Sequence, residues 1–551
     1  MATPVDPSKQ GHENVTETPV STPKSTSFWL VIASLCLIGF TASLDGSIIA
    51  IALPHISSAL DIGDKYVEVA NCFVFAQTVA QPAIAQLCNI FGRRWPMIIS
   101  IFVFALGSGV AGGAKNVATM IAGRTVQGLG SGGIMLLVEL IVCDLVPQRE
   151  RGQYLGIVLS FAALGSIVGP IIGGALATRD WKWCFFINLP ICAVVLPVQI
   201  FFLRIKHISV PLRGVITQVD WTGNVIFIGS IIGILIGLTF GGTVYSWSSW
   251  RIIVPIVVGC VGWASFHAYE YYIRNGSPCI PPRVFGNRTS AAAFYMVFIA
   301  SMLLQLTAFY FPVYFLAVRG TSIIQAGVDF LPFMLVLIPG SAVAGVILSK
   351  TGRYRRLHAL GFALSTLGLG LNTLLGRDTY AGVWAILQIV DALGKGLVLP
   401  TTLPAILASL PEKDVAAATG MYSFLRSFGY VWGITVPSIM FNNRFDQLSY
   451  QISDSQVRDS LAGGRAYQFA SDPYIHTLEP HVQSEVLDVY LQAIKVVWYG
   501  AMAFGATGLI AVAFEKRVAL RTELETDYGL QEKQKEDNHG SEIALREEGS
   551  P

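Results

Sequence analysis

Residues 156 to 174 read Gly156-x8-Gly165-x3-Gly169-Pro170-x2-Gly173-Gly174, all inside one apolar stretch without a charge. Each glycine inside a helix costs on the order of 1 kcal/mol relative to alanine, and an interior proline costs about 3 kcal/mol. In lipid the backbone has no water to bind, so the helix persists, and glycines let a neighbouring helix approach to backbone contact. The stretch therefore predicts a membrane helix with one closely packed face. A plain GxxxG-type dimerisation face is the simpler alternative.

The composition of the whole chain agrees with a membrane location. Of the 551 residues, 53% are hydrophobic and 13% are charged, and the mean hydropathy is +0.57. Such a chain is too apolar for a water-soluble globule, so we expect an integral membrane protein. A net charge of +2 gives no reason to expect a nucleic-acid partner. The eight cysteines follow neither a disulfide framework nor a zinc-site spacing, so we expect no metal and no cofactor.

Apolar stretches long enough to cross a bilayer recur along the chain. They predict about 14 transmembrane helices, near residues 28–54, 66–88, 95–114, 118–143, 153–177, 184–204, 221–242, 252–273, 291–317, 323–348, 357–376, 381–408, 415–440 and 489–514. The predicted fold class is an all-α integral membrane protein. An even number of spans places both termini on one side. The short loops on that side carry most of the Lys and Arg, so the positive-inside rule assigns the termini to the cytoplasm.

Two basic loops in corresponding positions indicate an internal duplication. Residues 91–94 (Phe-Gly-Arg-Arg) follow the second predicted span, and residues 350–353 (Lys-Thr-Gly-Arg) follow the tenth. If the spans divide as 6 + 2 + 6, two six-helix bundles flank an inserted helix pair. The predicted divisions are a disordered cytoplasmic tail (1–27), an N-terminal bundle (28–204), the inserted pair (205–275), a C-terminal bundle (276–514) with an extracellular loop near 443–487, and a charged cytoplasmic tail (515–551).

Two charged residues lie inside predicted spans at similar depth. Asp45 lies about nine residues from Pro54 in the first span, and Arg124 lies about six residues from the outer end of the fourth. A carboxylate inside a membrane is unfavourable unless it is paired, hydrated or protonated, so Asp45 predicts ion handling. A structural hydrogen bond to a neighbouring helix is the simpler alternative. We expect Asp45 and Arg124 to pair, so that a change in hydration or distance loads and releases a proton.

Several segments together resemble one family. The glycine-proline stretch resembles the fifth-span signature of the 14-span drug and proton antiporters of the major facilitator superfamily. Residues 44–54, 123–133 and 181–190 resemble the first-span signature, the fourth-span motif and the entry to the sixth span of that branch. The resemblance covers nearly the whole chain. It implies alternating access between two bundles, with Arg124 taking part in proton coupling. It also implies that the fifth helix, with its glycines and Pro170, shapes the interface between the halves and prevents leakage.

The loop after the second span departs from the family pattern at two positions. Residues 85–97 align with the superfamily's loop motif, but Ala85 replaces the usual first glycine and Asn89 replaces the usual aspartate. In the family that acid helps to latch the cytoplasmic gate through charge, so Asn89 implies a weaker latch. The candidate gate residues are Asn89, Gly92, Arg93, Arg94 and, in the thirteenth span, Arg426. Positive-inside anchoring explains Arg93 and Arg94 equally well.

Polar side chains in the middle of other spans are candidate cavity residues. Asp391 and Lys395 are four residues apart in span 12 and therefore lie on one helix face. They form either a local ion pair or a substrate or proton site. Gln127 and Gln388 are the further cavity candidates.

The predicted function is proton-coupled export of small amphipathic organic molecules, such as a toxin, a secondary metabolite or a drug. Residues 144–152 resemble fungal toxin and multidrug efflux pumps. The alternatives are a proton-driven importer, for example of iron chelates, and a transport-inactive membrane sensor. No nucleophile, base and metal set converges and no GxxxxGK[ST] loop occurs, so we expect neither an enzyme nor an ATP-driven pump. We expect a monomer in the lipid bilayer of the plasma membrane, or alternatively of the vacuolar membrane.

Overall fold

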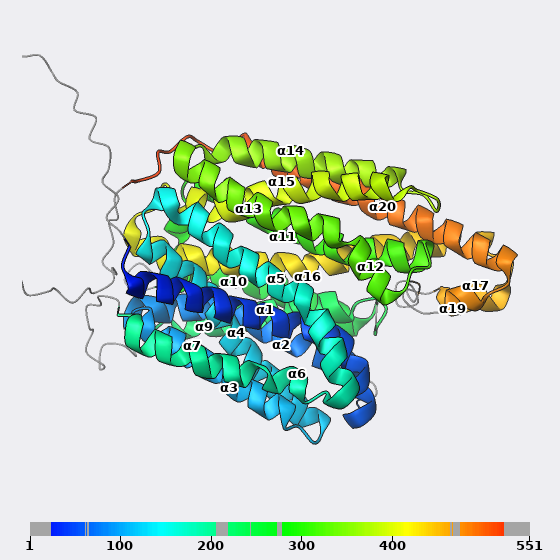
Figure 1. The fold of residues 1–551 in the computed structure, drawn as a ribbon, viewed down its shortest axis with the longest axis horizontal. Coiled ribbons are helices and arrows are strands. Elements are labelled where there is room, and N and C mark those ends of the chain that lie inside the picture. The colour runs from blue at the N-terminus through cyan, green and yellow to red at the C-terminus, as the bar shows by residue number, and fades with distance from the viewer. Residues whose placement is uncertain are drawn as a thin grey trace, which may run out of the picture.

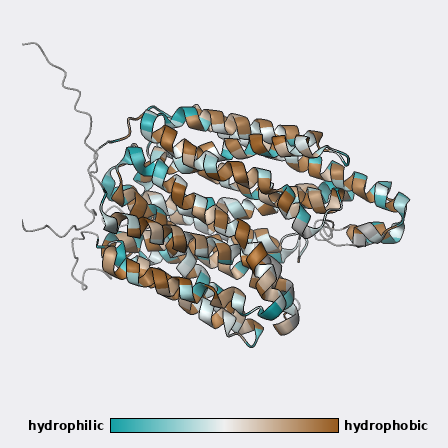
Figure 2. Cartoon of the chain, in the orientation of Figure 1, coloured by the Kyte–Doolittle hydropathy of each residue, from teal (hydrophilic) through white to brown (hydrophobic). Residues whose placement is uncertain are grey.

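The computed structural model describes residues 24–522, except 61, 63–64, 205–218, 243, 273–277, 463–465 and 467–473. Long helices lie side by side along one direction, and both ends of the described chain lie at the same end of the bundle (Figure 1). Hydrophobic residues cover the length of the helices, and hydrophilic residues gather towards their ends (Figure 2). We call the end that holds the chain ends the cytoplasmic end, after the positive-inside assignment, and the opposite end the outer end.

The N-terminal half contains one long helix for each of the first five predicted spans and a broken helix for the sixth. Its helices are α1 (Thr26–Leu60), α2 (Tyr66–Phe91), α3 (Arg94–Gly112), α4 (Val117–Leu145), α5 (Gln148–Asp180), the short α6 (Trp183–Phe186) and α7 (Asn188–Phe202). Within this half α1 packs against α5, and α4 packs against both α2 and α3. The glycine-rich α5 is a continuous helix of 33 residues.

The inserted pair and the C-terminal half complete the bundle. The pair is α9 (Trp221–Phe240) and α10 (Trp250–Tyr272), which pack against each other, and α9 also contacts α2 and α16. The C-terminal half consists of α11 (Arg288–Val313) with a π-helical turn at Tyr314–Val318, α12 (Ile323–Asp329), α13 (Leu331–Thr351), α14 (Tyr354–Leu371), α15 (Ala381–Leu407), α16 (Val415–Leu448), α17 (Ser455–Leu461), α19 (Tyr474–Thr477) and α20 (Pro480–Val512).

Among the described residues, twelve helical segments are long and apolar enough to cross a membrane. Helices α2 and α16 correspond to predicted spans but do not belong to that set; both carry many polar side chains and pack between other long helices. The all-helical membrane fold is therefore confirmed, while the count of fourteen spans stays a prediction. Two boundaries were wrong. The tenth predicted span is broken between α12 and α13, and the outer loop is shorter, since α16 extends to Leu448 and α20 begins at Pro480.

Both basic loops turn at a glycine with a positive φ, although the ψ angles differ (−169° at Gly92 and 16° at Gly352). Gly92 ends α2 with φ 76°, and Gly352 ends α13 with φ 63°. A positive φ is readily accessible to glycine but strained for other residues, so glycine at each position permits the tight turn into the next helix. A glycine with a positive φ at equivalent places in both loops fits the division into two related halves.

The two halves meet at the cytoplasmic end. The hydrogen bonds and ion pairs described between them come from the first thirteen residues of α5, from the cytoplasmic parts of α2 and α4, and from the segment after α20. Towards the outer end the two groups of helices diverge (Figure 1). The structure therefore represents a conformation that is closed on the cytoplasmic side.

Candidate functional site

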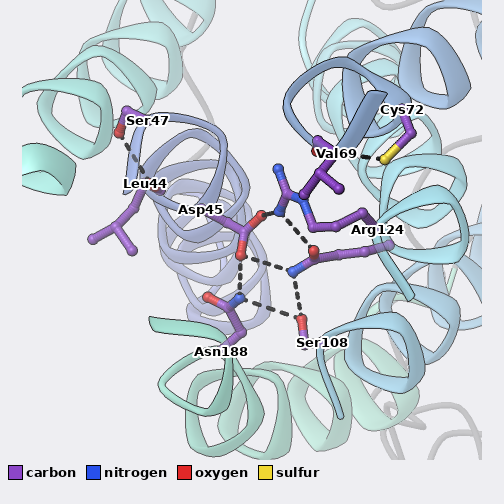
Figure 3. Close-up of polar contacts among 9 residues, drawn as sticks. Leu44, Asp45, Ser47, Val69, Cys72, Ser108, Arg124 and Asn188 are labelled. Carbon is purple, nitrogen blue, oxygen red and sulfur yellow. Dashed lines mark hydrogen bonds and ion pairs between the residues drawn. The ribbon is translucent and has the colours of Figure 1, made fainter. Parts of the chain in front are cut away.

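A buried polar cluster surrounds Asp45 in the N-terminal half (Figure 3). Arg124 Nη1 donates to Asp45 Oδ2 at 2.6 Å. Gln127 Nε2 and Asn188 Nδ2 each donate to Asp45 Oδ1 at 2.7 Å. Both amides also donate to Ser108 Oγ, at 2.7 and 3.2 Å. The structure thus brings Asp45 and Arg124 together, as expected, and adds Gln127 and Asn188 as uncharged partners, with Ser108 bound to both amides.

Four helices supply this cluster, and close helix packing makes it possible. Asp45 lies on α1, Ser108 on α3, Arg124 and Gln127 on α4, and Asn188 at the start of α7. A Cβ atom on Gly107 would lie 2.3 Å from the backbone nitrogen of Gln127, so glycine is what lets α3 approach α4 this closely. All five polar side chains are at most 1% exposed.

Arg124 is held by contacts of two kinds. Its guanidinium also donates to Gln127 Oε1 at 2.8 Å and lies 4.3 Å from the centre of the Phe73 ring, a cation–π distance. Its Nε and Nη2 groups have no hydrogen-bond partner among the described residues. A buried guanidinium with unused donors is poised to rearrange, because a new acceptor would gain hydrogen bonds without displacing existing ones.

Three donors converge on the Asp45 carboxylate. A proton taken up on either oxygen must compete with one of these donors, and it removes the charge that attracts Arg124. A proton on Asp45 would therefore weaken its bonds to Arg124 and to the two amides.

The glycines of α5 pack mainly within their own half. Added Cβ atoms on Gly165 and Gly169 would lie 2.3 Å from the Phe40 carbonyl oxygen and 1.9 Å from Ser47 Oγ, both on α1. Gly173 faces Ile48 of α1 in the same way, and Gly174 is half-buried.

The role of α5 at the interface is therefore divided. A Cβ on Gly156 would lie 2.9 Å from the carbonyl oxygen of Ser341 on α13, in the other half. The later glycines, Gly165, Gly169 and Gly173, face α1 instead and fix the helix that carries Asp45. The last described hydrogen bond to α13 runs from Ser160 Oγ to the Ile338 carbonyl oxygen. The helix thus links the boundary to the polar cluster.

A second buried cluster joins the two halves at the cytoplasmic end. Glu139 of α4 forms an ion pair with Arg426 of α16 and accepts a hydrogen bond from Ser423 Oγ at 2.5 Å. Nearby, Gln81 Nε2 of α2 donates to Ser427 Oγ at 3.1 Å. Glu139 is 1% exposed and Arg426 6%. Sequence reasoning missed Glu139, although an acid inside the apolar fourth span was the available signal.

A shell of polar contacts lies between this cluster and the cytoplasm. Arg149 donates to the carbonyl oxygens of Ser349 and Lys350, each at 2.7 Å. Arg151 Nη2 lies 3.5 Å from Glu412 Oε1, in the loop between α15 and α16. Burial raises the pKa of Glu412 above its usual value, although Arg151 opposes the shift. This shell closes the cytoplasmic end around the first turns of α5.

The predicted gate loop is tied to its own half. Arg93 Nε donates to Asp144 Oδ2 at 2.8 Å, and Arg94 Nη2 donates to the Ile200 carbonyl oxygen at 2.5 Å. The Asn89 side chain is exposed and has no described hydrogen bond. Among the predicted gate residues, it is Arg426 that reaches the other half, through Glu139, and the role of the loop in a gate stays a prediction.

The C-terminal half has a polar cluster of its own. Lys395 Nζ forms an ion pair with Asp391 and donates to Thr307 Oγ1 at 2.9 Å. Asp391 also accepts from Thr307 at 3.1 Å and from Ser365 at 2.8 Å. These residues come from α11, α14 and α15, which are the counterparts of α1, α3 and α4 if the halves are related.

The four predicted cavity residues do not line an open cavity in this conformation. Gln127 belongs to the Asp45 cluster, and Asp391 and Lys395 form an ion pair with each other. Gln388 Nε2 donates to the Asp329 carbonyl oxygen at 2.9 Å. All four side chains are at most 3% exposed. Polar side chains inside a helix bundle pair with each other when close partners are available, so the role of these four residues in a substrate cavity stays a prediction.

Comparison with known proteins identifies the family. The family model described as "Major Facilitator Superfamily" matches residues 35–217 and 224–434. The chain belongs to the major facilitator superfamily. It is 45% identical over 527 residues to "MFS efflux transporter aclA" of Aspergillus oryzae, covering 95% of this chain and 96% of the relative. It is 41% identical to "Efflux pump FUS6" of Gibberella moniliformis, covering 96% and 94%.

Solved structures agree on the fold of this superfamily member. The human organic anion transporter MFSD10 superposes with a TM-score of 0.56 at 15% identity, covering 88% of this chain and all of that chain. The proton:xylose symporter XylE superposes with a TM-score of 0.55 at 13% identity, covering 90% and 98%. At these identities the likeness concerns the fold alone.

Proposed function

We propose that this member of the superfamily is a proton-coupled exporter of small amphipathic organic molecules, such as a secondary metabolite or toxin. The two relatives described above, at 45% and 41% identity over nearly their whole length, are named an efflux transporter and an efflux pump, which supports export over import. The observation that carries proton coupling is the buried Asp45–Arg124 pair with its uncharged partners Gln127 and Asn188.

The coupling works through helix α1. Protonation of Asp45 removes the charge that holds Arg124, so α1 and α4 lose their ionic link. Because α1 is packed against the glycines of α5, and the start of α5 contacts α13, movement at Asp45 is transmitted to the boundary between the halves. The cytoplasmic Glu139–Arg426 pair then opens in one conformation and closes in the other, which gives alternating access.

The test uses inside-out membrane vesicles that contain the protein and have an acidic interior. We expect a panel of cationic, neutral and anionic hydrophobic dyes to include at least one that accumulates. The accumulation should collapse with a protonophore and should persist when ATP is absent. Accumulation that survives the protonophore would refute proton coupling, and movement of dyes only out of the vesicles would refute export.

The proposed exporter works as a monomer in the plasma membrane, with the substrate and protons as its ligands. Sedimentation of the purified protein in detergent tests the monomeric state. Localisation of a fluorescent fusion tests the membrane assignment, and a signal confined to the vacuolar membrane would contradict it.

A further inference from the structure

A basic pocket lies at the cytoplasmic end, away from both charged clusters. It has a volume of about 660 Å³ and forms where the segment after α20 crosses the turn between α13 and α14. Its lining residues are Gly352, Arg353, Tyr354, Arg355, Arg356, Ala359, Arg517, Val518 and Ala519. Four of the nine are arginines and none is acidic, so the pocket concentrates positive charge.

The charge in this pocket is not compensated by the protein. Among the described residues, none of the four arginines forms an ion pair, and all four side chains are exposed. The nearby acid Glu515 is buried and contacts His358 Nδ1 at 2.9 Å instead. Like charges gathered this closely repel one another, so an anion that contacts several of them gains affinity.

The pocket is held in shape by both of its walls. Tyr354 Oη accepts from the Val518 backbone nitrogen at 3.0 Å and donates to the Lys516 carbonyl oxygen at 2.6 Å. Arg355 Nη2 also reaches the Ala513 carbonyl oxygen at 3.5 Å. The C-terminal segment is therefore fixed against α14, and Arg517 is brought to the other arginines.

We propose that this pocket binds the phosphate-bearing headgroup of an anionic lipid of the cytoplasmic leaflet. Guanidinium groups bind phosphate oxygens in a bidentate manner. The pocket lies at the cytoplasmic end, where basic residues gather. Two exposed apolar side chains are close in sequence to its lining: Leu360 (53% exposed) follows Ala359, and Phe514 (58% exposed) lies three residues before Arg517. These apolar side chains provide a surface for acyl chains, which a free phosphate ester would not use.

The lipid also acts on the closed conformation. Beyond the pocket, the C-terminal segment reaches the N-terminal half, where the Arg521 backbone nitrogen donates to Gln148 Oε1 at 3.3 Å and its carbonyl accepts from the Arg149 backbone nitrogen at 3.1 Å. A headgroup that joins Arg517 to Arg355 and Arg356 holds this segment in place. Bound lipid therefore stabilises the closed cytoplasmic end.

The test measures binding of a fluorescent phosphatidylinositol phosphate to the purified full-length protein in neutral detergent. The Arg355→Gln/Arg356→Gln variant should bind about thirtyfold more weakly, from the contribution of two basic residues at an anionic surface. Arg517→Gln, on the other wall, should also weaken binding. Arg204→Gln, which removes an exposed arginine of the cytoplasmic end outside the pocket, should bind like the wild type. Equal binding by all of these proteins overturns the proposal.

A competition experiment distinguishes binding of a lipid headgroup from binding of a soluble phosphate. Unlabelled anionic lipid should displace the probe, whereas phosphatidylcholine, inorganic phosphate and a soluble inositol phosphate should not. Displacement by the soluble phosphates at the same concentration as the lipid would overturn the lipid assignment. Because these measurements need no transport, they stand or fall independently of the proposed export function.

Discussion

Glu139 of α4 and Arg426 of α16 form a buried ion pair that joins the two halves of the molecule at the cytoplasmic end. Both charges are removed from water, so each depends on the other for compensation. Removing one partner of such a pair typically costs about 3–5 kcal/mol. The pair can therefore act as the lock of the cytoplasm-closed conformation.

Substitution of Glu139 should open this lock. Glu139→Gln keeps the size of the side chain and an acceptor for Ser423 but removes the charge. Opening can be measured with the Ser427→Cys substitution, because Ser427 is buried beside Gln81 in the closed conformation. The substitution is made together with Cys260→Ser, which removes the one exposed cysteine. We expect Glu139→Gln to raise the modification of the Ser427→Cys reporter by a membrane-impermeant maleimide about tenfold, equivalent to ~1.4 kcal/mol. Substitution of an exposed glutamate, Glu68→Gln, is the control. Equal modification rates in Glu139→Gln and in this control would contradict a lock formed by Glu139 and Arg426.

Substitution of Asp45 should affect both stability and coupling, and a double variant separates the two effects. Asp45→Asn leaves Arg124 buried without its counter-charge, so we expect a lower unfolding temperature. Asp45→Asn/Arg124→Gln removes both charges and should recover part of that stability while staying inactive in dye export. Export by the double variant at the wild-type rate would show that the pair is structural only.

The glycines of α5 should tolerate no side chain towards α1. A Cβ on Gly165 would lie 2.3 Å from the Phe40 carbonyl oxygen, so we expect Gly165→Ala to destabilise the protein by about 1–3 kcal/mol. The matched control is Gly39→Ala in α1, where no atom lies within 4 Å of the added Cβ, and which should be neutral or stabilising. Thermal unfolding of the purified proteins measures both. Equal unfolding temperatures would refute the close packing.

Closure of the cytoplasmic end should depend on pH through Glu412. Burial raises the pKa of Glu412, with Arg151 and Arg521 opposing the shift and Asp144 adding to it. The closed state therefore binds a proton more readily than an open state in which Glu412 meets water. The resulting stabilisation of the closed state relative to the open state is present below the usual glutamate pKa of about 4.3. It is lost as the pH rises through the raised pKa of Glu412.

The neutral variant Glu412→Gln removes this dependence. Both proteins carry the Ser427→Cys reporter, and the maleimide modification rate is measured at each pH. The ratio of the rate with Glu412 to the rate with Gln at this position should rise as the pH increases through the raised pKa of Glu412. Identical pH profiles for the two proteins would show that Glu412 does not titrate with closure.

The sequence predicted the membrane class and the place of most helices, because apolar stretches of fixed length are a strong local signal. Intramembrane charges are rare, so the pairing of Asp45 with Arg124 could be expected from the residues alone. The break between α12 and α13 was missed, although Asp329 just before it and Pro332 just after it were available signals for a helix end and a new helix start.

The partners that came from other helices could not be predicted in the same way. Asn188 reaches Asp45, and Ser108 reaches the amides of Asn188 and Gln127, only because the backbones of α3, α4 and α7 converge, and no spacing in the sequence records that approach. Glu139 was a detectable signal, but its pairing with Arg426 depends on how the two halves meet. The direction in which the α5 glycines face was likewise set by tertiary packing.

Proton movement itself tests the central claim most directly. Proteoliposomes with a trapped pH-sensitive dye and no initial pH gradient would receive, from outside, a substrate found in the vesicle screen. We predict that protons leave the wild-type proteoliposomes as substrate enters, so that the interior becomes alkaline. Asp45→Asn at the same protein density should show no pH change. Substrate movement with no proton movement in the wild type, or the same proton movement in Asp45→Asn, would contradict the account.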